Sequence, residues 1–441
     1  MTKRSLRFFA TSLGVILLMG ILSACGAGTQ SNSGNSGNAT ATVLIKIATD
    51  LPASGQDASS GKPAENGAHL AVDQANQQNL IPGYKFVFDP QDDVGASGVH
   101  DPSVGAKNIT SLIGDSQVAG VVGPFNSSVA EAEMPIANTA PLALISPANT
   151  NTCLTQTAPS TGCTGSNQLV SKLRPSGNVT YFRIATTDNH QGGVGADFSY
   201  KTLGNKTAYL IDDTELYGVG LANAFIAQYK ADGGTILGHD SIASTTDYSQ
   251  ELTKIAHAKP AEIYFAGLDS TGGISIRKQM ATTPGLQNTP LVGGDGLQTS
   301  SFANAIGTSG APVYSTVAAI DATKLPSAAS FIQQYNSAYG QKAFGAYSAG
   351  GYDCAWILMK AIKAAIAGGA KAPANGSDSD TAKTFRQAVI NSIMKTDYSG
   401  VTGHQSFDAN GDTTNKTVTV YQLGDVNGAA GWKYVTAQTL P

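Results

Sequence analysis

The sequence predicts an α/β fold with two lobes. From Val43 onward, short apolar runs typical of strands alternate with runs of helical periodicity. The alternation stops in a polar, cysteine-bearing stretch from Thr150 to Thr180 and then starts again. A body of about 400 residues is more than one core usually serves. Because repeated βα units form parallel sheets with right-handed crossovers, we expect two Rossmann-like lobes with a cleft between them.

The first βα series contains four predicted strands, at Val43–Thr49, Tyr84–Asp89, Val118–Val122 and Leu142–Ser146. A helix is expected to open near Pro63, because proline is favoured in a first turn. Asp101 is a good cap for a second helix that runs from Pro102 through Ile113. A third helix is predicted from Ser128 to Thr139.

The second series restarts after the polar stretch. Its predicted strands are Phe182–Ala185, Thr207–Ile211, Thr235–His239, Ile263–Phe265, Leu291–Val292 and Val313–Ala319. Its predicted helices are Gly193–Thr202, Gly218–Ala231, Ser249–Ala258 and Gly273–Met280. Helices at Ala328–Tyr339 and Tyr347–Ala367 and one more helix follow. The tail FDANGDTTNKTVTVYQL is predicted to be a hairpin that ends in a strand.

The N-terminus has the pattern of an export signal. Lys3, Arg4 and Arg7 precede the apolar run LGVILLMGIL, which is about half as long as a membrane span requires. The run ends in Leu-Ser-Ala-Cys at residues 22–25, which resembles a bacterial lipobox. We therefore expect residues 1–24 to be a lipoprotein signal peptide, Cys25 to be lipidated, and the Gly/Ser/Asn-rich residues 25–42 to form a flexible tether.

Charge and cysteine content narrow the function further. Loss of the signal peptide removes three cations and no acid, so the formal charge moves from −4 to about −7. The sequence contains no block rich in Lys or Arg, which argues against nucleic acid as a partner. Cys153 and Cys163 lie in a polar loop of an exported chain and are expected to form a disulfide. Cys354 is expected to be a small core residue.

No motif for catalysis, a metal or a cofactor assembles in the sequence. The six histidines show no metal-ligand spacing, and Walker A, GxGxxG and GxSxG motifs are absent. The segment DANGD at 408–412 resembles the start of a calcium loop but lacks the later glycine and glutamate, so a turn is the better reading. Asp92 and Asp93 are more simply explained by a solvated turn than by acid/base chemistry. We therefore expect no enzyme activity, no metal and no cofactor.

Small polar residues cluster where the fourth predicted strand ends. The run LISPANTNTCLT starts at Leu144 and contains Ser146, Asn149 and Thr150. Loops at the carboxyl ends of strands in open α/β sheets are where ligands usually dock, although turn chemistry alone also favours Asn and Pro there. The cluster is therefore a candidate half-site for a small ligand.

Several short motifs resemble the extracytoplasmic binding proteins of branched-chain amino acid ABC transporters. In chain order they are SG at 54–55, ENGA at 65–68, VVGPFNSS at 121–128, ISPANT at 145–150, DTELYG at 213–218 and GGDG at 293–296. The resemblance covers Val43 to about Leu423. It implies a type I periplasmic-binding fold with two lobes joined by three crossover segments. The first lobe would comprise residues 43–185 and 318–415, and the second lobe residues 186–317 and 416–441. It also implies a monomer that delivers its ligand to a membrane permease.

The resemblance also assigns roles to residues. Ser127 and Thr150 would bind the α-carboxylate of an amino acid, the Asn149 carbonyl would accept from the α-ammonium, Asp295 would pair with the ammonium, and Tyr217 would come from the second lobe. The chemistry is consistent, because a zwitterion in a closed cleft needs both charges paired or hydrogen-bonded.

The side-chain pocket departs from the family pattern. Phe125 keeps an apolar wall, but Ser60 and Asp269 stand where the family places pocket aromatics, and Asn126 replaces a cysteine of its best-known members. These differences put a strictly aliphatic ligand in doubt and leave amides, urea, aromatic acids or other small solutes open. A ligand-sensing receptor with the same fold is a further alternative.

Overall fold

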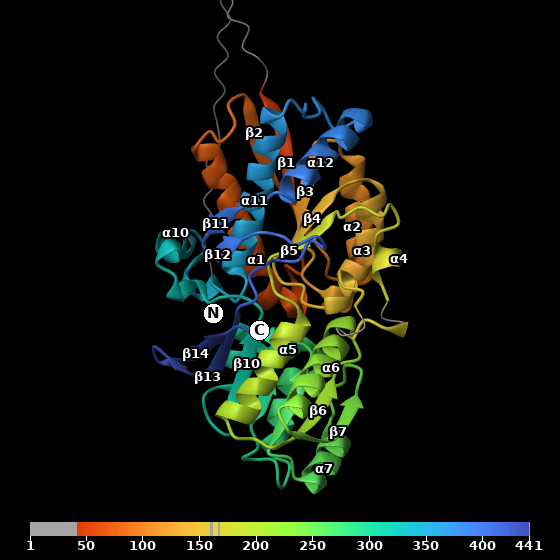
Figure 1. Ribbon diagram of the computed structural model, residues 1–441. Helices are drawn as coiled ribbons and strands as arrows, with labels where there is room; N and C mark the ends of the chain where they lie inside the picture. Colours follow the sequence, from red (N-terminus) through yellow and green to blue (C-terminus); the bar gives the residue numbers. More distant parts are fainter. Residues whose placement is uncertain (1–41, 159–161, 166–167, 441) are drawn as a thin grey trace, which may run out of the picture. The chain divides into compact units, whose positions relative to one another are not determined.

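Two mostly parallel β-sheets organise the chain in a computed structural model that describes residues 42–158, 162–165 and 168–440 (Figure 1). The predicted signal peptide, Cys25 and nearly all of the predicted tether lie outside these residues. We call the part built on the five-stranded sheet the first lobe and the part built on the seven-stranded sheet the second lobe.

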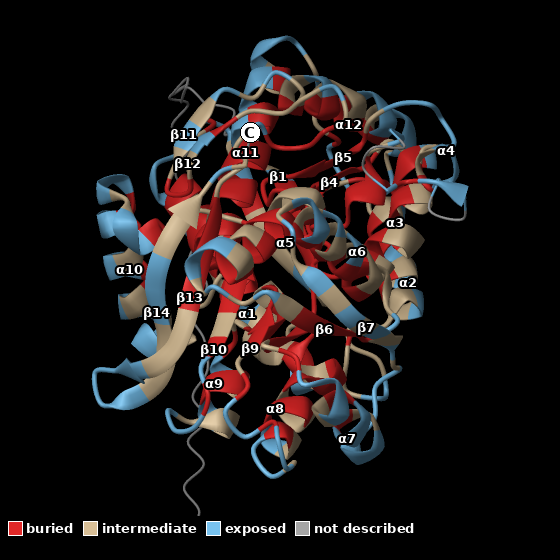
Figure 2. Ribbon diagram, turned by 60° about the horizontal axis from the view of Figure 1, so that its bottom comes forward, coloured by how far each residue is buried: buried red, intermediate tan, exposed pale blue. Residues whose placement is uncertain are grey.

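The first sheet is entirely parallel, with the strand order β2-β1-β3-β4-β5. Its strands are β1 (Val43–Leu51), β2 (Tyr84–Asp92), β3 (Val118–Val122), β4 (Ala143–Ser146) and β5 (Tyr181–Arg183). Both faces are covered by helices, so β3 and β4 are buried at every position, as expected for a central parallel strand (Figure 2).

Helices from two distant parts of the sequence cover the first sheet. They are α1 (Ala58–Gln77), α2 (Pro102–Gly114), α3 (Ser127–Thr139), α4 (Val170–Leu173), α10 (Ala329–Tyr339), α11 (Ser348–Ala367) and α12 (Ser379–Ile393). The larger core joins β1 to α1, α11 and α12 through residues such as Ile47, Leu358 and Phe385. The opposite face packs on α2 and α3 through Ile109 and Met134. A small hairpin of β11 (Tyr398–Gly400) and β12 (Gly403–Gln405) follows α12.

The second sheet has the order β14-β13-β10-β9-β8-β6-β7. Its parallel strands are β6 (Thr207–Asp212), β7 (Thr235–Ser241), β8 (Glu262–Ala266), β9 (Leu291–Gly293) and β10 (Val313–Val317). β13 (Val418–Val426) and β14 (Ala429–Gln438) add an antiparallel edge. The helices of this lobe are α5 (Asp188–Asp197), α6 (Leu216–Ala231), α7 (Ser249–Ala258), α8 (Ile274–Met280) and α9 (Ser300–Ile306).

Three segments connect the lobes, after β5, after β10 and after β12. They lie side by side, because Thr186 N donates to the Ala318 carbonyl (2.9 Å) and Thr413 N donates to the Arg183 carbonyl (3.0 Å). The fold is therefore the α/β architecture of two doubly wound lobes that the sequence predicted. The residue limits given above for each lobe stay a prediction.

Two helices begin five residues earlier than predicted. α1 starts at Ala58 and contains Pro63 in its second turn, so the proline removes one helical hydrogen bond instead of starting the helix. α5 starts at Asp188 and not at Gly193. The predicted helix therefore contains Gly193 and Gly195 but lacks the first five residues of α5, Gly192 among them. The glycines of α5 serve close packing, because a Cβ at Gly192 would lie 2.8 Å from the Phe225 backbone nitrogen of α6.

Other expectations at strand ends were also wrong. β5 covers Tyr181–Arg183 and not Phe182–Ala185. The tail at 407–423 does close a turn, through an antiparallel bridge between Phe407 and Thr413, and it does end in β13. The longer hairpin was missed: β13 pairs with β14 through a two-residue Asn427-Gly428 turn with positive φ at both positions. Asp93 does not stand in a solvated turn, because it is fully buried.

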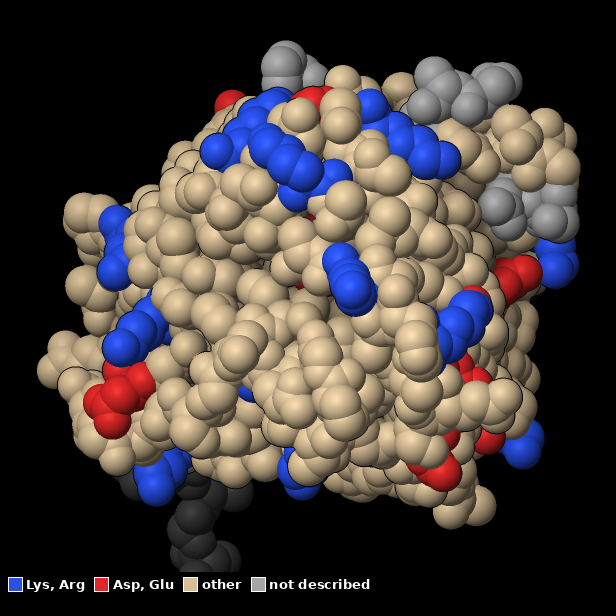
Figure 3. All heavy atoms as spheres, turned by 90° about the horizontal axis from the view of Figure 1, so that it is seen from below, with Lys and Arg blue, Asp and Glu red and all other residues tan. Residues whose placement is uncertain are grey.

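Three further features concern membrane spans, surface charge and the free cysteine Cys354. Among the described residues, no helix combines the length and apolarity needed to cross a membrane. Seen from below, Lys and Arg side chains stand apart over most of the surface, with a few gathered at one rim, and much of this face carries neither charge (Figure 3). Cys354 is buried in α11, as expected of a core residue.

Candidate functional site

The candidate site lies at the carboxyl ends of parallel strands from both lobes. Ser127 is the first residue of α3 after β3, and Asn149 and Thr150 follow β4 in the first lobe. Tyr217 lies in the first turn of α6 after β6, and Asp295 follows β9 in the second lobe. This edge is where open α/β sheets bind ligands.

Asp295 is the centre of a hydrogen-bonded group that includes both lobes. Its Oδ1 accepts from Gln191 Nε2 (2.5 Å) and from the Tyr217 hydroxyl (2.9 Å). Its Oδ2 accepts from the hydroxyl of Tyr347, which precedes α11 in the first lobe, at 3.1 Å. Burial raises the pKa of Asp295, while the donors act in the opposite direction. The sequence identified Tyr217 and Asp295 but missed Gln191 and Tyr347.

An aromatic wall adjoins the Asp295 group. The ring of Phe125 meets the ring of Tyr347 edge to face, with centroids 5.6 Å apart. Both rings come from the first lobe and belong to one apolar cluster that also contains Val317 and Tyr421 of the second sheet. The wall therefore combines an apolar surface with the Tyr347 hydroxyl, which reaches Asp295 from the first lobe.

The polar loop after β4 is tied down by its own hydrogen bonds. The Ser146 hydroxyl accepts from the backbone nitrogens of Ala148 (3.2 Å) and Asn149 (2.8 Å) and donates to the Pro124 carbonyl (2.6 Å). The Asn149 side chain donates to the Phe125 carbonyl and accepts from the Tyr181 hydroxyl (2.8 Å). Part of the polar cluster is therefore structural. Within the described residues, the Ser127 hydroxyl has no hydrogen-bond partner, although Ser127 is 2 % exposed.

Asp188 is a second acid at this site, and the sequence reasoning missed it. Its backbone nitrogen donates to the Thr150 carbonyl (2.7 Å), and its side chain is buried. Neither carboxylate oxygen has a hydrogen bond of ordinary geometry within the described residues. Burial raises the pKa of Asp188 to about 8, with a further contribution from Asp295 and an opposing one from Thr150. The run Thr-Thr-Asp at 186–188 is typical of a helix N-terminus, and this pattern could have drawn attention to Asp188.

The lobes approach each other closely at the start of α6. Asn151 of the first lobe donates from Nδ2 to the Leu216 carbonyl at 2.6 Å. Gly220 makes this approach possible, because a Cβ there would lie 2.5 Å from Asn151 Nδ2 and 2.8 Å from Asp188 Oδ2.

The structure does not bring Ser60 and Asp269 into the Asp295 group. Ser60 lies in the first turn of α1 and is partly exposed. Asp269 is bound within its own lobe, where Oδ2 accepts from the Thr299 hydroxyl (2.6 Å) and Oδ1 from Ser270 N (2.9 Å). Burial raises the pKa of Asp269 to about 6. Their part in a side-chain pocket stays a prediction.

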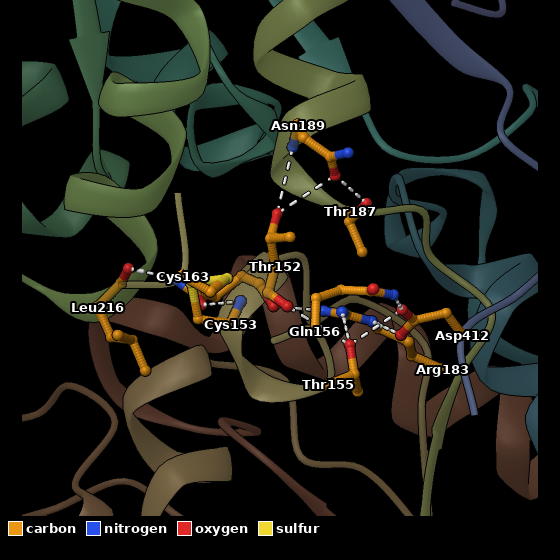
Figure 4. Close-up of a disulfide and its surroundings, with 11 residues drawn as sticks. Thr152, Cys153, Thr155, Gln156, Cys163, Arg183, Thr187, Asn189, Leu216 and Asp412 are labelled. Atoms are coloured by element: carbon orange, nitrogen blue, oxygen red, sulfur yellow. Dashed lines mark hydrogen bonds and ion pairs between the residues drawn. A yellow bond between two sulfur atoms is a disulfide. The ribbon is translucent and has the colours of Figure 1, made fainter. Parts of the chain in front are cut away.

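A disulfide and a buried ion pair support the loop that carries Asn149 and Thr150 (Figure 4). Cys153 and Cys163 are bonded, with Cα atoms 5.2 Å apart. Arg183 is fully buried and donates to Asp412 Oδ1 (2.7 Å), to the Asn151 carbonyl (2.7 Å) and to the Thr155 hydroxyl (2.6 Å). Because Asp412 belongs to the third crossover segment, the pair links the loop to the connection between the lobes.

The described residues offer no arrangement of His, Cys, Asp and Glu that suits a metal ion. The candidate site instead contains hydrogen-bond donors, two buried carboxyl groups and an aromatic wall. Such a set can pair an ammonium group and satisfy a carboxylate, which is the chemistry of binding a small zwitterion.

Comparison with known proteins identifies the family. A family model described as "Periplasmic binding protein" matches residues 44–429. A Leu/Ile/Val-binding protein of Rhizobium johnstonii is 31 % identical over 283 residues, which cover 64 % of this chain and 69 % of that protein. An amino acid binding protein of Pseudomonas aeruginosa is 25 % identical over 400 residues, covering 89 % of this chain and 93 % of its own.

Solved structures show the same fold. LivJ of Streptococcus pneumoniae, solved in complex with isoleucine, is 25 % identical with a TM-score of 0.68 and covers 90 % of this chain and 99 % of its own. A solute binding protein of Rhodopseudomonas palustris in complex with p-hydroxybenzoic acid has a TM-score of 0.72 at 17 % identity, covering 90 % and 97 % of the two chains. The chain therefore belongs to the periplasmic binding protein family, with the type I fold, in the group that includes the Leu/Ile/Val-binding proteins.

Proposed function

We propose that this protein is the solute-binding receptor of an ABC importer and that it captures an amino acid between its lobes. The family is one of extracytoplasmic binding proteins and is not an enzyme family. The observation that carries the proposal is the Asp295 carboxylate, which receives donors from both lobes. An acid in this position pairs the α-ammonium of a ligand when the cleft closes around it.

The remaining roles follow from the chemistry of a zwitterion. Ser127 and Thr150 donate to the α-carboxylate, and the Asn149 carbonyl together with Asp188 accepts from the ammonium. The Asn149 carbonyl already accepts one hydrogen bond, from Arg183 Nη1 at 3.4 Å, and a carbonyl oxygen has a second lone pair. Tyr217, Phe125 and Tyr347 enclose the ligand. Ser60 and Asp269 line the side-chain end and favour a ligand with a polar group there.

The two acids favour an amino acid over an aromatic acid such as hydroxybenzoate. A ligand without an ammonium group leaves Asp188 and Asp295 with no cation in a closed cleft. A buried acid without a cation ionises less readily, whereas a nearby ammonium group favours its charged form, so the two acids bind an ammonium group better than a neutral group. Relatives named for Leu/Ile/Val binding support the same class of ligand.

Calorimetry tests the proposal directly. The processed chain, freed of co-purified ligand, is titrated with the standard amino acids, urea, short amides and 4-hydroxybenzoate. We expect saturable binding of an amino acid near micromolar Kd, about −8 kcal/mol. Asp295→Asn should weaken binding at least about 100-fold, because a charge-assisted contact is lost, whereas the exposed Asp425→Asn should not. Binding of a benzoate or an amide alone would overturn the amino acid proposal and leave the fold intact.

We also propose that Cys25 is lipidated and holds a monomeric receptor at the outer side of the cell membrane, near its permease. A lipid-anchored tether keeps the binding body close to the transporter. In the native host, Cys25→Ala should release the protein from the membrane fraction. A variant that remains in the membrane fraction would contradict the anchor.

A further inference from the structure

A buried histidine connects the two lobes at a second place, outside the Asp295 group. His100 lies in the loop between β2 and α2 of the first lobe, and its side chain is 1 % exposed. Its Nδ1 lies 2.8 Å from Asp57 Oδ2, and its Nε2 lies 2.9 Å from Glu215 Oε2. Asp57 precedes α1 in the first lobe, whereas Glu215 precedes α6 in the second lobe. We call Asp57, His100 and Glu215 the clasp.

The ring of His100 carries a proton on both nitrogens. Each nitrogen faces a carboxylate oxygen, which accepts hydrogen bonds and cannot donate when ionised. Burial alone would lower the pKa of His100, but the hydrogen bonds to Asp57 and Glu215 outweigh it and raise the pKa to about 10. Asp93, which follows β2, is a further buried acid near this ring; burial raises its pKa, and His100 opposes that rise. The imidazolium is therefore present throughout the physiological pH range.

The contact between His100 and Glu215 crosses between the lobes, and Ser270 of the second lobe also lies close enough to Asp57 to lower its pKa by hydrogen bonding. Asp57 Oδ2 also accepts from the backbone nitrogen of His100 at 2.9 Å, so these two residues stay paired within the first lobe. Glu215 comes from the second lobe and receives a further, longer contact from the Ser128 hydroxyl at 3.4 Å. Any movement of the lobes away from each other separates Glu215 from His100 and Ser128.

The clasp adjoins the candidate ligand residues from both sides. Glu215 stands two positions before Tyr217, whose hydroxyl donates to Asp295. Ser128 follows Ser127 in the first turn of α3. Closing the lobes on a ligand at Ser127, Tyr217 and Asp295 therefore brings Glu215 to His100 in the same movement.

We propose that the Glu215–His100 contact sets how long the closed cleft persists, without taking part in the choice of ligand. Both ring nitrogens of His100 are engaged by acids, so neither is free for a ligand. The Glu215 side chain is 32 % exposed, so water replaces its partner when the cleft opens. This inference rests on the proposed function only where ligand release is measured, because the distance between the lobes can be measured without a ligand.

The size of the effect follows from the kind of contact. A charge-assisted hydrogen bond stabilises more than a neutral one, and partial exposure of Glu215 reduces its contribution. We expect loss of this contact to speed ligand release about ten-fold, equally for every ligand that binds. Association should change little, because the contact forms only as the lobes meet.

Paired spin labels test closure directly. Thr110→Cys on α2 and Ala227→Cys on α6 are exposed positions on different lobes, and Cys25→Ser removes the other reactive thiol. Electron–electron resonance then measures the distance between the labels with and without excess L-isoleucine. We expect Glu215→Ala to enlarge the population with long distances in both conditions. Stopped-flow release should accelerate about ten-fold, and less for Glu215→Gln, whose amide oxygen still accepts from the imidazolium.

The matched control is Glu251→Gln on α7, which removes one acid from the same lobe away from the clasp. It should leave distances and release unchanged. Unaltered distances and release rates in Glu215→Ala would overturn the clasp, as would a change in release for one ligand and not for others. If no amino acid binds, the proposed function fails, and the label distances without ligand still decide on the clasp.

Discussion

Three carboxyl groups of the first lobe lie buried close to one another with few donors. Asp50 at the end of β1 receives Asn108 Nδ2 on Oδ1 (2.9 Å), but its other oxygen has no partner within the described residues. Glu133 and Asp93 are fully buried and receive no donor from another residue among those described, but the Glu133 and Asp50 carboxyl groups lie within hydrogen-bonding reach of each other. Burial raises the pKa of Asp50 to about 7, although hydrogen bonds with Glu133 and Asn108 act in the opposite direction. Burial also raises the pKa values of Glu133 and Asp93, and the nearby Asp50 raises both further.

These shifts determine how stability depends on pH. A carboxyl group that ionises less readily when folded destabilises the folded chain as pH rises from its unfolded pKa towards its folded pKa. Glu133→Gln removes one such group and supplies donors to Asp50. We expect urea unfolding to give a gain of about 1–3 kcal/mol at pH 8 and little change at pH 4.

Glu131→Gln is the control for this prediction, because Glu131 lies on the same helix and pairs with the exposed Lys172. It should alter stability by less than about 1 kcal/mol at either pH. A loss of stability at pH 8 in Glu133→Gln would mean that the Glu133 carboxylate has a stabilising partner.

The Arg183–Asp412 pair has the opposite pH behaviour. Burial would raise the pKa of Asp412, but the Arg183 guanidinium lowers it below its usual value. The pair therefore stabilises the folded chain above the unfolded pKa of the acid, and this contribution is lost as pH falls through the lowered value. We expect Asp412→Asn to cost about 3 kcal/mol in urea unfolding at pH 7, because it leaves a buried guanidinium without its anion. The exposed Asp397→Asn should cost almost nothing, and equal effects of the two variants would contradict this account.

At the scale of elements, the disulfide fixes a segment that has little regular structure. Cys153 lies in a single turn and Cys163 in a loop, and both side chains are buried beside Leu154, Leu169 and Leu173. The bond closes a loop with a sequence separation of 10 residues. A loop of this size restricts the unfolded chain by about 2–3 kcal/mol.

We therefore expect Cys153→Ser with Cys163→Ser to lower the free energy of unfolding by about 2–3 kcal/mol. The measurement is urea unfolding of the double variant and of the unaltered chain with and without a reductant. The reductant should bring the unaltered chain to the stability of the variant and leave the variant unchanged. A reductant effect of equal size in both would point to Cys354 instead.

Helices and strands were predictable from the sequence where a single hydrophobic pattern dominates the segment. The apolar run Val118–Val122 and the amphipathic Ser249–Ala258 match β3 and α7 at both ends. The predictions failed where tertiary packing overrides local preference, as for Pro63 inside α1 and the start of α5. Among site residues, Tyr217 and Asp295 were identifiable from short motifs. Tyr347 was not, because its contact with Asp295 joins positions 52 residues apart that belong to different lobes.

At the scale of the whole molecule, ligand binding and stability are linked. A ligand that bridges both lobes binds only the folded chain, so it adds stability in proportion to the logarithm of its free concentration. At 100 times its Kd, the amino acid identified by calorimetry should add about 2.7 kcal/mol to the free energy of unfolding. Asp295→Asn should abolish most of this gain at the same ligand concentration. A gain that does not grow with ligand concentration would contradict binding at a single site.

The helices over the first sheet have a consequence for how the chain is completed during synthesis. Ile45 and Ile47 of β1 pack against Trp356 and Leu358 of α11 and Phe385 of α12. A ribosome makes β1 long before α11 and α12, and it makes all the parallel strands of the second lobe in between. The face of the first sheet that packs on α1, α11 and α12 is therefore covered only in part, by α1, until residues 348–393 have been made. The described segment that is synthesised first is among the last to be fully packed.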